Sequence, residues 1–190
     1  MKFNLVAACL ATCLAVPAWA WGWTLDPAQS AVSFGSIKND YTGEAHSFGR
    51  ISGTVDPAGM VQIDMDLTSV ATNIDIRDER MVHHIFGDAA TATMTAQVPL
   101  ADLEALEVGA STIMEVEAEL SLLGVETPLD VQVFVLRLAP DRVLVSTNAP
   151  AFVATEDLEI DQGVDILQEL AGLDSITRVV PLTARLVFQK

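Results

Sequence analysis

A period-two alternation of apolar and polar residues is the feature that most constrains this chain. Residues 61–67 read Val-Gln-Ile-Asp-Met-Asp-Leu, and residues 114–122 read Met-Glu-Val-Glu-Ala-Glu-Leu-Ser-Leu. Successive side chains of a β-strand point to opposite faces, so such runs predict strands with one buried face. The pattern indicates about eight strands, over residues 31–35, 48–55, 61–67, 92–98, 114–122, 129–133, 143–147 and 179–188.

Turns and helices are expected where this alternation stops. Proline and glycine predict turns at residues 56–59, 124–128 and 139–141. Asn73–Phe86 mixes charges with apolar residues and predicts a loop or a short helix. Asp161–Leu173 carries apolar residues at helical spacing, so it predicts a helix against the wall or mouth of the strand assembly.

An all-β fold follows, because this many one-faced strands must bury their apolar faces together. A sandwich and a closed barrel both achieve this. Many inward positions carry small residues or methionine, which adapts to a flexible guest, but a filled core accounts for the pattern equally well. Alternation assigns these residues to the interior: Phe34, Ile51, Ile63, Met65, Met94, Met114, Val116, Leu120, Leu182 and Leu186.

The first twenty residues predict a cleaved signal peptide. Lys2 is followed by an apolar run over residues 5–16, then Pro17 and the small-x-small sequence Ala18-Trp19-Ala20. The run is shorter than the roughly 20 apolar residues that span a bilayer. We therefore expect a signal peptide over 1–20, one domain over 21–190 and periplasmic export. Both cysteines, Cys9 and Cys13, leave with the peptide, so no disulfide or thiol chemistry is expected.

Strong negative charge limits the partners. Loss of Lys2 leaves nine of the ten basic residues against 26 acidic ones, a formal charge of −17 for the mature chain. This charge repels nucleic-acid phosphates and anionic lipid headgroups. We expect no nucleic-acid binding, and only transient contact with a membrane or a membrane protein.

The sequence contains no recognisable catalytic or metal-binding motif. It contains no G-x-S-x-G elbow, P-loop or G-x-G-x-x-G sequence. His83 and His84 are adjacent and diverge on either a strand or a helix, so even with His46 they predict no metal site. We expect neither enzyme activity nor a bound metal.

Five segments, in order, resemble YceI-like proteins. The opening Trp23 to Phe34 matches W-x-x-D-x-x-x-S-x-V-x-F, and Phe48 to Val55 matches F-x-x-x-x-G-x-(V/I). Residues 69–78 resemble S-V-x-T...R-D, and residues 120–129 resemble L-x-(I/L)-x-G-(V/I)-(T/E)-x-P-(V/L). The segment from Asp161 to Leu182 resembles a subgroup with an inserted helix before the last strand.

The resemblance implies an eight-stranded, antiparallel, lipocalin-like barrel with a short helix before the last strand. It also implies a periplasmic protein that binds a polyisoprenoid, such as an isoprenoid quinone or a polyprenol, as a carrier, scavenger or reservoir. No other cofactor is expected. We add Met81 and Phe86 to the interior residues above as ligand-binding candidates. Arg80 and Met81 stand where the family usually has His and Leu, so the lip of the pocket is expected to differ.

Charges near one loop bear on the headgroup. Lys38, Arg77 and Arg80 are candidate phosphate ligands, but four carboxylates lie beside them in sequence: Asp40, Asp75, Asp78 and Glu79. We expect the two arginines to pair with these neighbours, which predicts a neutral quinone headgroup over a phosphate. Three alternatives stay open: a filled structural or interaction module accessory to a membrane redox or stress system, a hydrolase of small lipids, and a homodimer of the barrel.

Overall fold

The computed structural model describes residues 22–190. The predicted signal peptide and both cysteines lie outside the described residues. The strands are β1 (Trp23–Leu25), β2 (Ala31–Lys38), β3 (Thr42–Phe48), β4 (Ile51–Val55), β5 (Met60–Asp66), β6 (Val70–Ala71), β7 (Thr91–Gln97), β8 (Ser111–Leu122), β9 (Val125–Ala139), β10 (Arg142–Thr147), β11 (Ala151–Ala154) and β12 (Val179–Gln189). The helices are α1 (Asp75–Met81), α2 (Leu100–Glu104) and α3 (Asp161–Ala171), with a 3₁₀ turn η1 (Leu67–Ser69) and a π-helical turn η2 (Val82–Phe86).

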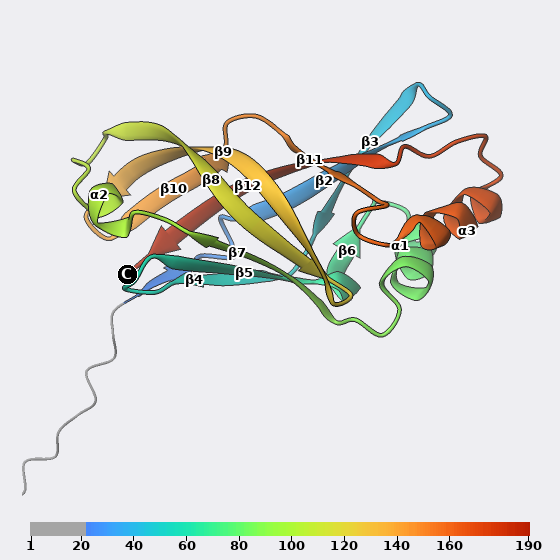
Figure 1. The fold of residues 1–190 in the computed structure, drawn as a ribbon, viewed down its shortest axis with the longest axis horizontal. Coiled ribbons are helices and arrows are strands. Elements are labelled where there is room, and N and C mark those ends of the chain that lie inside the picture. The colour runs from blue at the N-terminus through green and yellow to red at the C-terminus, as the bar shows by residue number, and fades with distance from the viewer. Residues whose placement is uncertain (1–21) are drawn as a thin grey trace, which may run out of the picture.

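Eight of these strands close into an antiparallel barrel (Figure 1). Hydrogen-bonded neighbours run β1-β4-β5-β7-β8-β9-β10-β12, and β12 returns to β1. The C-terminal half of β12 pairs with β10 and β1, and its N-terminal half pairs with β2 and β11. The long β12 therefore joins the closed ring to an extension of β2, β3 and β6. The predicted eight-stranded barrel is confirmed.

Alternation determines which side chains face inward. On β8, Val116, Ala118 and Leu120 are buried, whereas the glutamates between them are exposed. Leu122 pairs with Val125 across the β8–β9 hairpin. Leu123 and Gly124 form its two-residue turn with φ of 55° and 83°. The turn predicted over 124–128 is present at Gly124 but is shorter and starts one residue earlier, because Val125 to Pro128 already lie within β9.

Several strands carry too little apolar alternation to be predicted. Thr42–Phe48 (β3) contains Gly43, Glu44 and His46, and pairs with β2 along its whole length. The single strand expected over 48–55 is divided, because the chain bends at residues 49–50 and β4 begins at Ile51. The short elements β1, β6, β11 and α2 were also not expected from the pattern.

Helical segments gather at one end of the barrel. Figure 1 places α1 and α3 together at one end and α2 at the opposite end. The helix predicted over 161–173 is confirmed as α3, and the segment 73–86 forms α1 and η2. Gly163 of α3 lies so close to η2 that a Cβ there would be 2.4 Å from the carbonyl oxygen of His84. Within residues 22–190, no helix is long and apolar enough to cross a membrane.

Candidate functional site

A cavity of about 450 Å³ lies inside the barrel and under the helices of one end. Strands β2, β3, β5 and β7–β12 contribute to its wall, and α1, η2 and α3 contribute residues at its mouth. The wall is overwhelmingly apolar, and the volume falls in the range of small-molecule sites, about 300–1,000 Å³. The barrel interior is therefore not filled by its own side chains.

The structure divides the predicted interior residues into three groups. Eight of them line the large cavity: Phe34, Met65, Met81, Phe86, Met94, Leu120, Leu182 and Leu186. Ile63, Met114 and Val116 line a second cavity of about 120 Å³, which Met94 and Leu186 also border. Ile51 is buried in the packed core and borders neither cavity. Which of these residues touch a ligand stays a prediction.

Other lining residues were missed. Val131 and Val133 of β9 lie on the apolar face of a run that does alternate, and Val164 and Leu167 lie on the apolar face of α3. Their periodicity was sufficient to identify them. Phe48 was missed as a lining residue because the pattern assigned it to the strand expected over 48–55, whereas it ends β3. Its ring packs between those of Phe34 and Phe86, with centroid distances of 5.4 and 6.3 Å.

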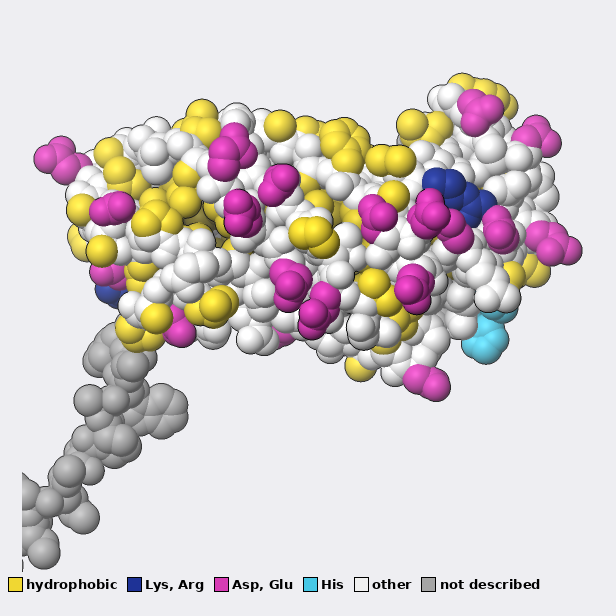
Figure 2. Space-filling view, in the orientation of Figure 1, with side chains coloured by type: hydrophobic (Ala, Val, Ile, Leu, Met, Phe, Trp, Pro, Cys, Tyr) yellow, Lys and Arg dark blue, Asp and Glu magenta, His cyan; other side chains and the backbone are white. Residues whose placement is uncertain are grey.

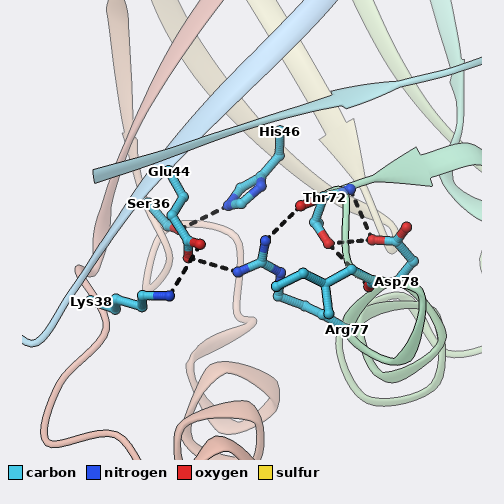
Figure 3. Close-up of polar contacts among 8 residues, drawn as sticks. Ser36, Lys38, Glu44, His46, Thr72, Arg77 and Asp78 are labelled. Carbon is cyan, nitrogen blue, oxygen red and sulfur yellow. Dashed lines mark hydrogen bonds and ion pairs between the residues drawn. The ribbon is translucent and has the colours of Figure 1, made fainter. Parts of the chain in front are cut away.

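Polar side chains gather at the mouth of the large cavity (Figure 3). Phe34, Ser36 and Lys38 lie on the inward face of β2, and the β2–β3 register sets Ser36 opposite Glu44 and Phe34 opposite His46. Glu44 receives hydrogen bonds from Lys38 Nζ at 3.1 Å and from Arg77 Nη1 at 2.6 Å. The mouth therefore combines polar residues of one hairpin with an arginine of α1.

The predicted pairing of the arginines is wrong. Arg77 pairs with Glu44 and donates through Nη2 to the Thr72 carbonyl at 2.7 Å. Asp78 instead accepts from the Thr72 backbone N–H at 2.9 Å and from its hydroxyl, which anchors the start of α1. Adjacent residues of a helix point about 100° apart, so Asp78 does not face its neighbour. Arg80 donates to the Leu170 carbonyl at 3.3 Å.

The charges of the mouth cancel in part, because three cations (Lys38, Arg77 and Arg80) lie beside two carboxylates. Lys38 and Arg77 share the carboxylate of Glu44, and Asp78 lies on the far side of Thr72. Burial raises the pKa of Glu44, but the hydrogen bonds from Lys38 and Arg77 outweigh it and hold that pKa below its ordinary value. Glu44 is therefore ionised at neutral pH, and its single carboxylate offsets one of the two positive charges while hydrogen-bonding to both cations.

His46 is a buried polar residue of this cluster, with 5% of its surface exposed. Its Nε2 lies 2.9 Å from Ser36 Oγ, and its ring centroid lies 5.1 Å from that of Phe34. Burial, aided by the charge of Arg77, lowers the pKa of His46. A neutral ring follows at neutral pH. In the described part of the chain, His46 Nδ1 and Arg77 Nε have no hydrogen-bond partner.

The opposite end of the barrel is closed by an aromatic and ionic cluster. Trp23 donates through Nε1 to Glu104 of α2 at 2.9 Å, and Lys190 Nζ lies 2.7 Å from the same carboxylate oxygen. The Arg137 guanidinium lies over the Trp23 ring, 5.0 Å from its centroid. Hydrogen bonds from Lys190 and Trp23 lower the pKa of Glu104.

Metal ligands are not brought together within residues 22–190, where no three His, Cys, Asp or Glu side chains form a group that could hold an ion. The rings of His83 and His84 contact each other edge to face, with centroids 4.6 Å apart. His46 lies in the mouth cluster instead.

Comparison with known proteins identifies relatives of this fold. A polyisoprenoid binding domain from Saccharophagus degradans, implicated in plant cell wall breakdown, is 35% identical, with a TM-score of 0.85 over 88% of this chain and 97% of that chain. BcnA of Burkholderia cenocepacia is 16% identical and shares the fold, with a TM-score of 0.64 over 86% of this chain and 98% of that one. No curated protein matches the chain. The YceI-like domain matches residues 23–188, and the chain therefore belongs to the YceI-like family.

Proposed function

We propose that this protein binds a long isoprenoid lipid, with the apolar tail inside the barrel and the headgroup at the polar mouth, and that it catalyses no reaction. The observation that carries the proposal is the apolar cavity of about 450 Å³, which opens beside Glu44, His46 and Arg77. The similarity to a polyisoprenoid binding domain, at 35% identity over nearly the whole of that domain, supports this class of ligand.

Hydrophobic energies suit reversible binding. Burial of one methylene-sized group contributes about 0.8 kcal/mol, so each five-carbon isoprene unit contributes several kcal/mol in total. A bilayer stabilises the same tail by a similar amount. Net transfer between membrane and barrel is then close to balanced, as a carrier, scavenger or reservoir requires.

The headgroup we propose is neutral, and a quinone fits best. A phosphate needs several uncompensated cations. Lys38 and Arg77 are instead both committed to Glu44. A quinone carbonyl needs only a hydrogen-bond donor. Arg77 Nε is an unpartnered N–H donor, and neutral His46 supplies another when its proton is on Nδ1.

We further propose that the protein acts in the periplasm and meets a membrane only transiently. The signal-peptide features of residues 1–20 support export. Exposed apolar side chains flank the mouth, on the β2–β3 hairpin (Ile37, and Tyr41 with 82% of its surface exposed) and on α1 (Ile76). Acidic side chains are scattered over the face shown in Figure 2, and repulsion from anionic headgroups shortens any residence on a membrane.

Native mass spectrometry of the exported protein tests the proposal. We expect a mature chain that begins at Trp21 and carries an isoprenoid quinone, which organic extraction releases for identification. A phosphorylated polyprenol as the dominant ligand would overturn the neutral headgroup. Failure to carry or take up any isoprenoid would leave the structural-module alternative. The same spectra report whether the barrel dimerises.

A pair of variants tests whether the tail lies in the barrel. Leu120 faces the large cavity from β8, and its neighbour Glu119 faces solvent. Leu120→Trp should lower quinone affinity about tenfold or more because the indole occupies tail space. Glu119→Trp places the same ring outside and should leave binding unchanged. Equal affinities in two folded variants would place the tail elsewhere.

A further inference from the structure

A second cavity, of about 120 Å³, lies at the end of the barrel far from the mouth. Its wall is almost wholly apolar. The strands contribute Ile63, Met114 and Val116, and α2 contributes Leu100 and Leu103. A water in such a space finds too few hydrogen-bond partners to be held. The chemistry of this cavity therefore favours hydrocarbon.

Only one layer of side chains separates the two cavities. Met94, Val131, Val133, Val145 and Leu186 border both of them. Met94 is only partly buried. Because a methionine side chain has three rotatable bonds, it can change rotamer and open a passage between the two cavities. A slender chain that fills the large cavity thus has a continuous apolar route past Met94.

The second cavity does not continue through the end of the barrel. Trp23, Arg137 and Lys190 stack at that end, and Glu104 ties Trp23 and Lys190 to α2. This cluster closes the end of the barrel and so limits how far along the barrel axis a tail can extend.

An opening lies in the side wall instead. Pairing between β7 and β8 extends only from Thr93–Ser121 to Ala96–Ala118. The remaining part of β8, residues 111–117, pairs with β9 alone among the described strands. In Figure 2 apolar side chains line a hollow on this side of the barrel, between β8 and β7.

We propose that the second cavity is the binding site for the terminal isoprene units of a long tail. This inference rests on the proposed function and adds to it the place where the far end of the tail binds. Allowing about 10–15 Å³ for each water-sized group, the cavity holds roughly ten such groups, or about two isoprene units. Longer tails leave the barrel through the gap beside α2.

Two quinones with the same headgroup test the inference, one with a tail of about two isoprene units and one with about eight. Met114 lines only the second cavity, and its neighbour Ile113 on β8 points outward with 54% of its surface exposed. Met114→Trp should weaken binding of the long-tailed quinone about tenfold or more and leave the short-tailed one unchanged. Ile113→Trp should change neither affinity.

A second filling variant guards against misfolding of the strand. Leu103→Trp fills the same cavity from α2, outside the barrel wall, and should reproduce the selective loss. Unchanged long-tail binding in a folded Met114→Trp or Leu103→Trp protein overturns the tail-end site while the proposed function stands. A wild-type protein that binds neither quinone overturns both.

Discussion

Arg77 of α1 and Glu44 of β3 form an ion pair across the mouth of the barrel, with 2.6 Å between Nη1 and Oε2. Glu44 also accepts from Lys38, so two cations beside the cavity share one carboxylate. All three side chains are only partly exposed, which limits screening by solvent. Glu44 therefore determines the electrostatic character of the site where a headgroup would lie.

Glu44→Gln should change headgroup preference. The amide keeps the shape but removes the negative charge, leaving Lys38 and Arg77 uncompensated and available to an anion. We expect the ratio of affinities for a polyprenyl phosphate over an isoprenoid quinone to rise about tenfold. Competition between the two lipids, read by native mass spectrometry, measures this ratio.

The control for this experiment removes one negative charge from a nearby glutamate that does not line the cavity. Glu79 lies on α1, is exposed and does not line the cavity. Glu79→Gln should leave the ratio of affinities unchanged. If both variants shift the ratio equally, overall charge and not the Glu44 ion pair governs the preference.

The barrel could be predicted from sequence because most of its strands obey one rule. On β8 and β5, apolar side chains that alternate with polar residues point into the interior. The strand β3 escaped prediction because two of its inward positions hold Glu44 and His46. These are residues of the mouth, and a local pattern fails most readily where polar groups have been placed inside for function.

The pairing of Arg77 lay beyond sequence reasoning for a different reason. Its partner is 33 residues away, on a strand that the pattern did not reveal. Nearby carboxylates suggested a local pair, but Asp78 is engaged with Thr72. The size of the cavity was equally hidden, since alternation identifies inward residues without measuring the space between them.

The β8–β9 hairpin offers a direct test of backbone strain. Leu123 adopts a φ of 55° in the two-residue turn, is 41% exposed and lies outside the hydrophobic core. A left-handed conformation costs most residues roughly 1–2 kcal/mol, whereas asparagine tolerates it. The β2–β3 turn already has Asn39 and Asp40 at such angles. Leu123→Asn should raise the free energy of unfolding by about 1 kcal/mol.

Urea unfolding measures the effect of this substitution. Leu123→Ala is the matched control, because it removes the same side chain but keeps a residue unsuited to positive φ. We expect the alanine variant to gain nothing. An asparagine variant no more stable than the alanine variant would mean that the turn is not strained.

Close packing of α3 on η2 predicts an unusual effect of alanine. Alanine normally stabilises a helix by about 1 kcal/mol relative to glycine. At Gly163, however, a Cβ would lie 2.4 Å from the His84 carbonyl oxygen and 3.1 Å from Ile85 Cα, both backbone atoms. We expect Gly163→Ala to lower the free energy of unfolding by about 1–2 kcal/mol and to speed lipid release, because α3 must shift from the mouth.

Gln162→Ala provides the control on the same helix, since Gln162 is exposed and its neighbour Gly163 is buried. This substitution should be neutral or slightly stabilising in urea unfolding. A stabilised Gly163→Ala protein would show that α3 can move away from η2 without loss, and that the contact does not hold the helix in place.

His46 predicts how stability depends on pH. Burial holds the pKa of His46 below its ordinary value of 6.5, so on acidification the unfolded chain takes up a proton before the folded chain does. The stability contributed by neutral His46 is complete above 6.5 and is lost as pH falls from 6.5 toward the folded pKa. Glu44 and Glu104 have pKa values below 4.5, so their contributions are lost only at lower pH.

Urea midpoints between about pH 7.5 and 5.5 therefore isolate His46. We expect the wild-type midpoint to fall across this window and His46→Gln, which cannot be protonated, to flatten the fall. His83 is exposed, so His83→Gln should retain the wild-type slope. A titration of His46 by NMR should give a pKa below 6.5. A His46→Gln protein with the wild-type slope would mean that another group controls the acid sensitivity. Burial in the mouth of the cavity would then not oppose protonation of the His46 ring.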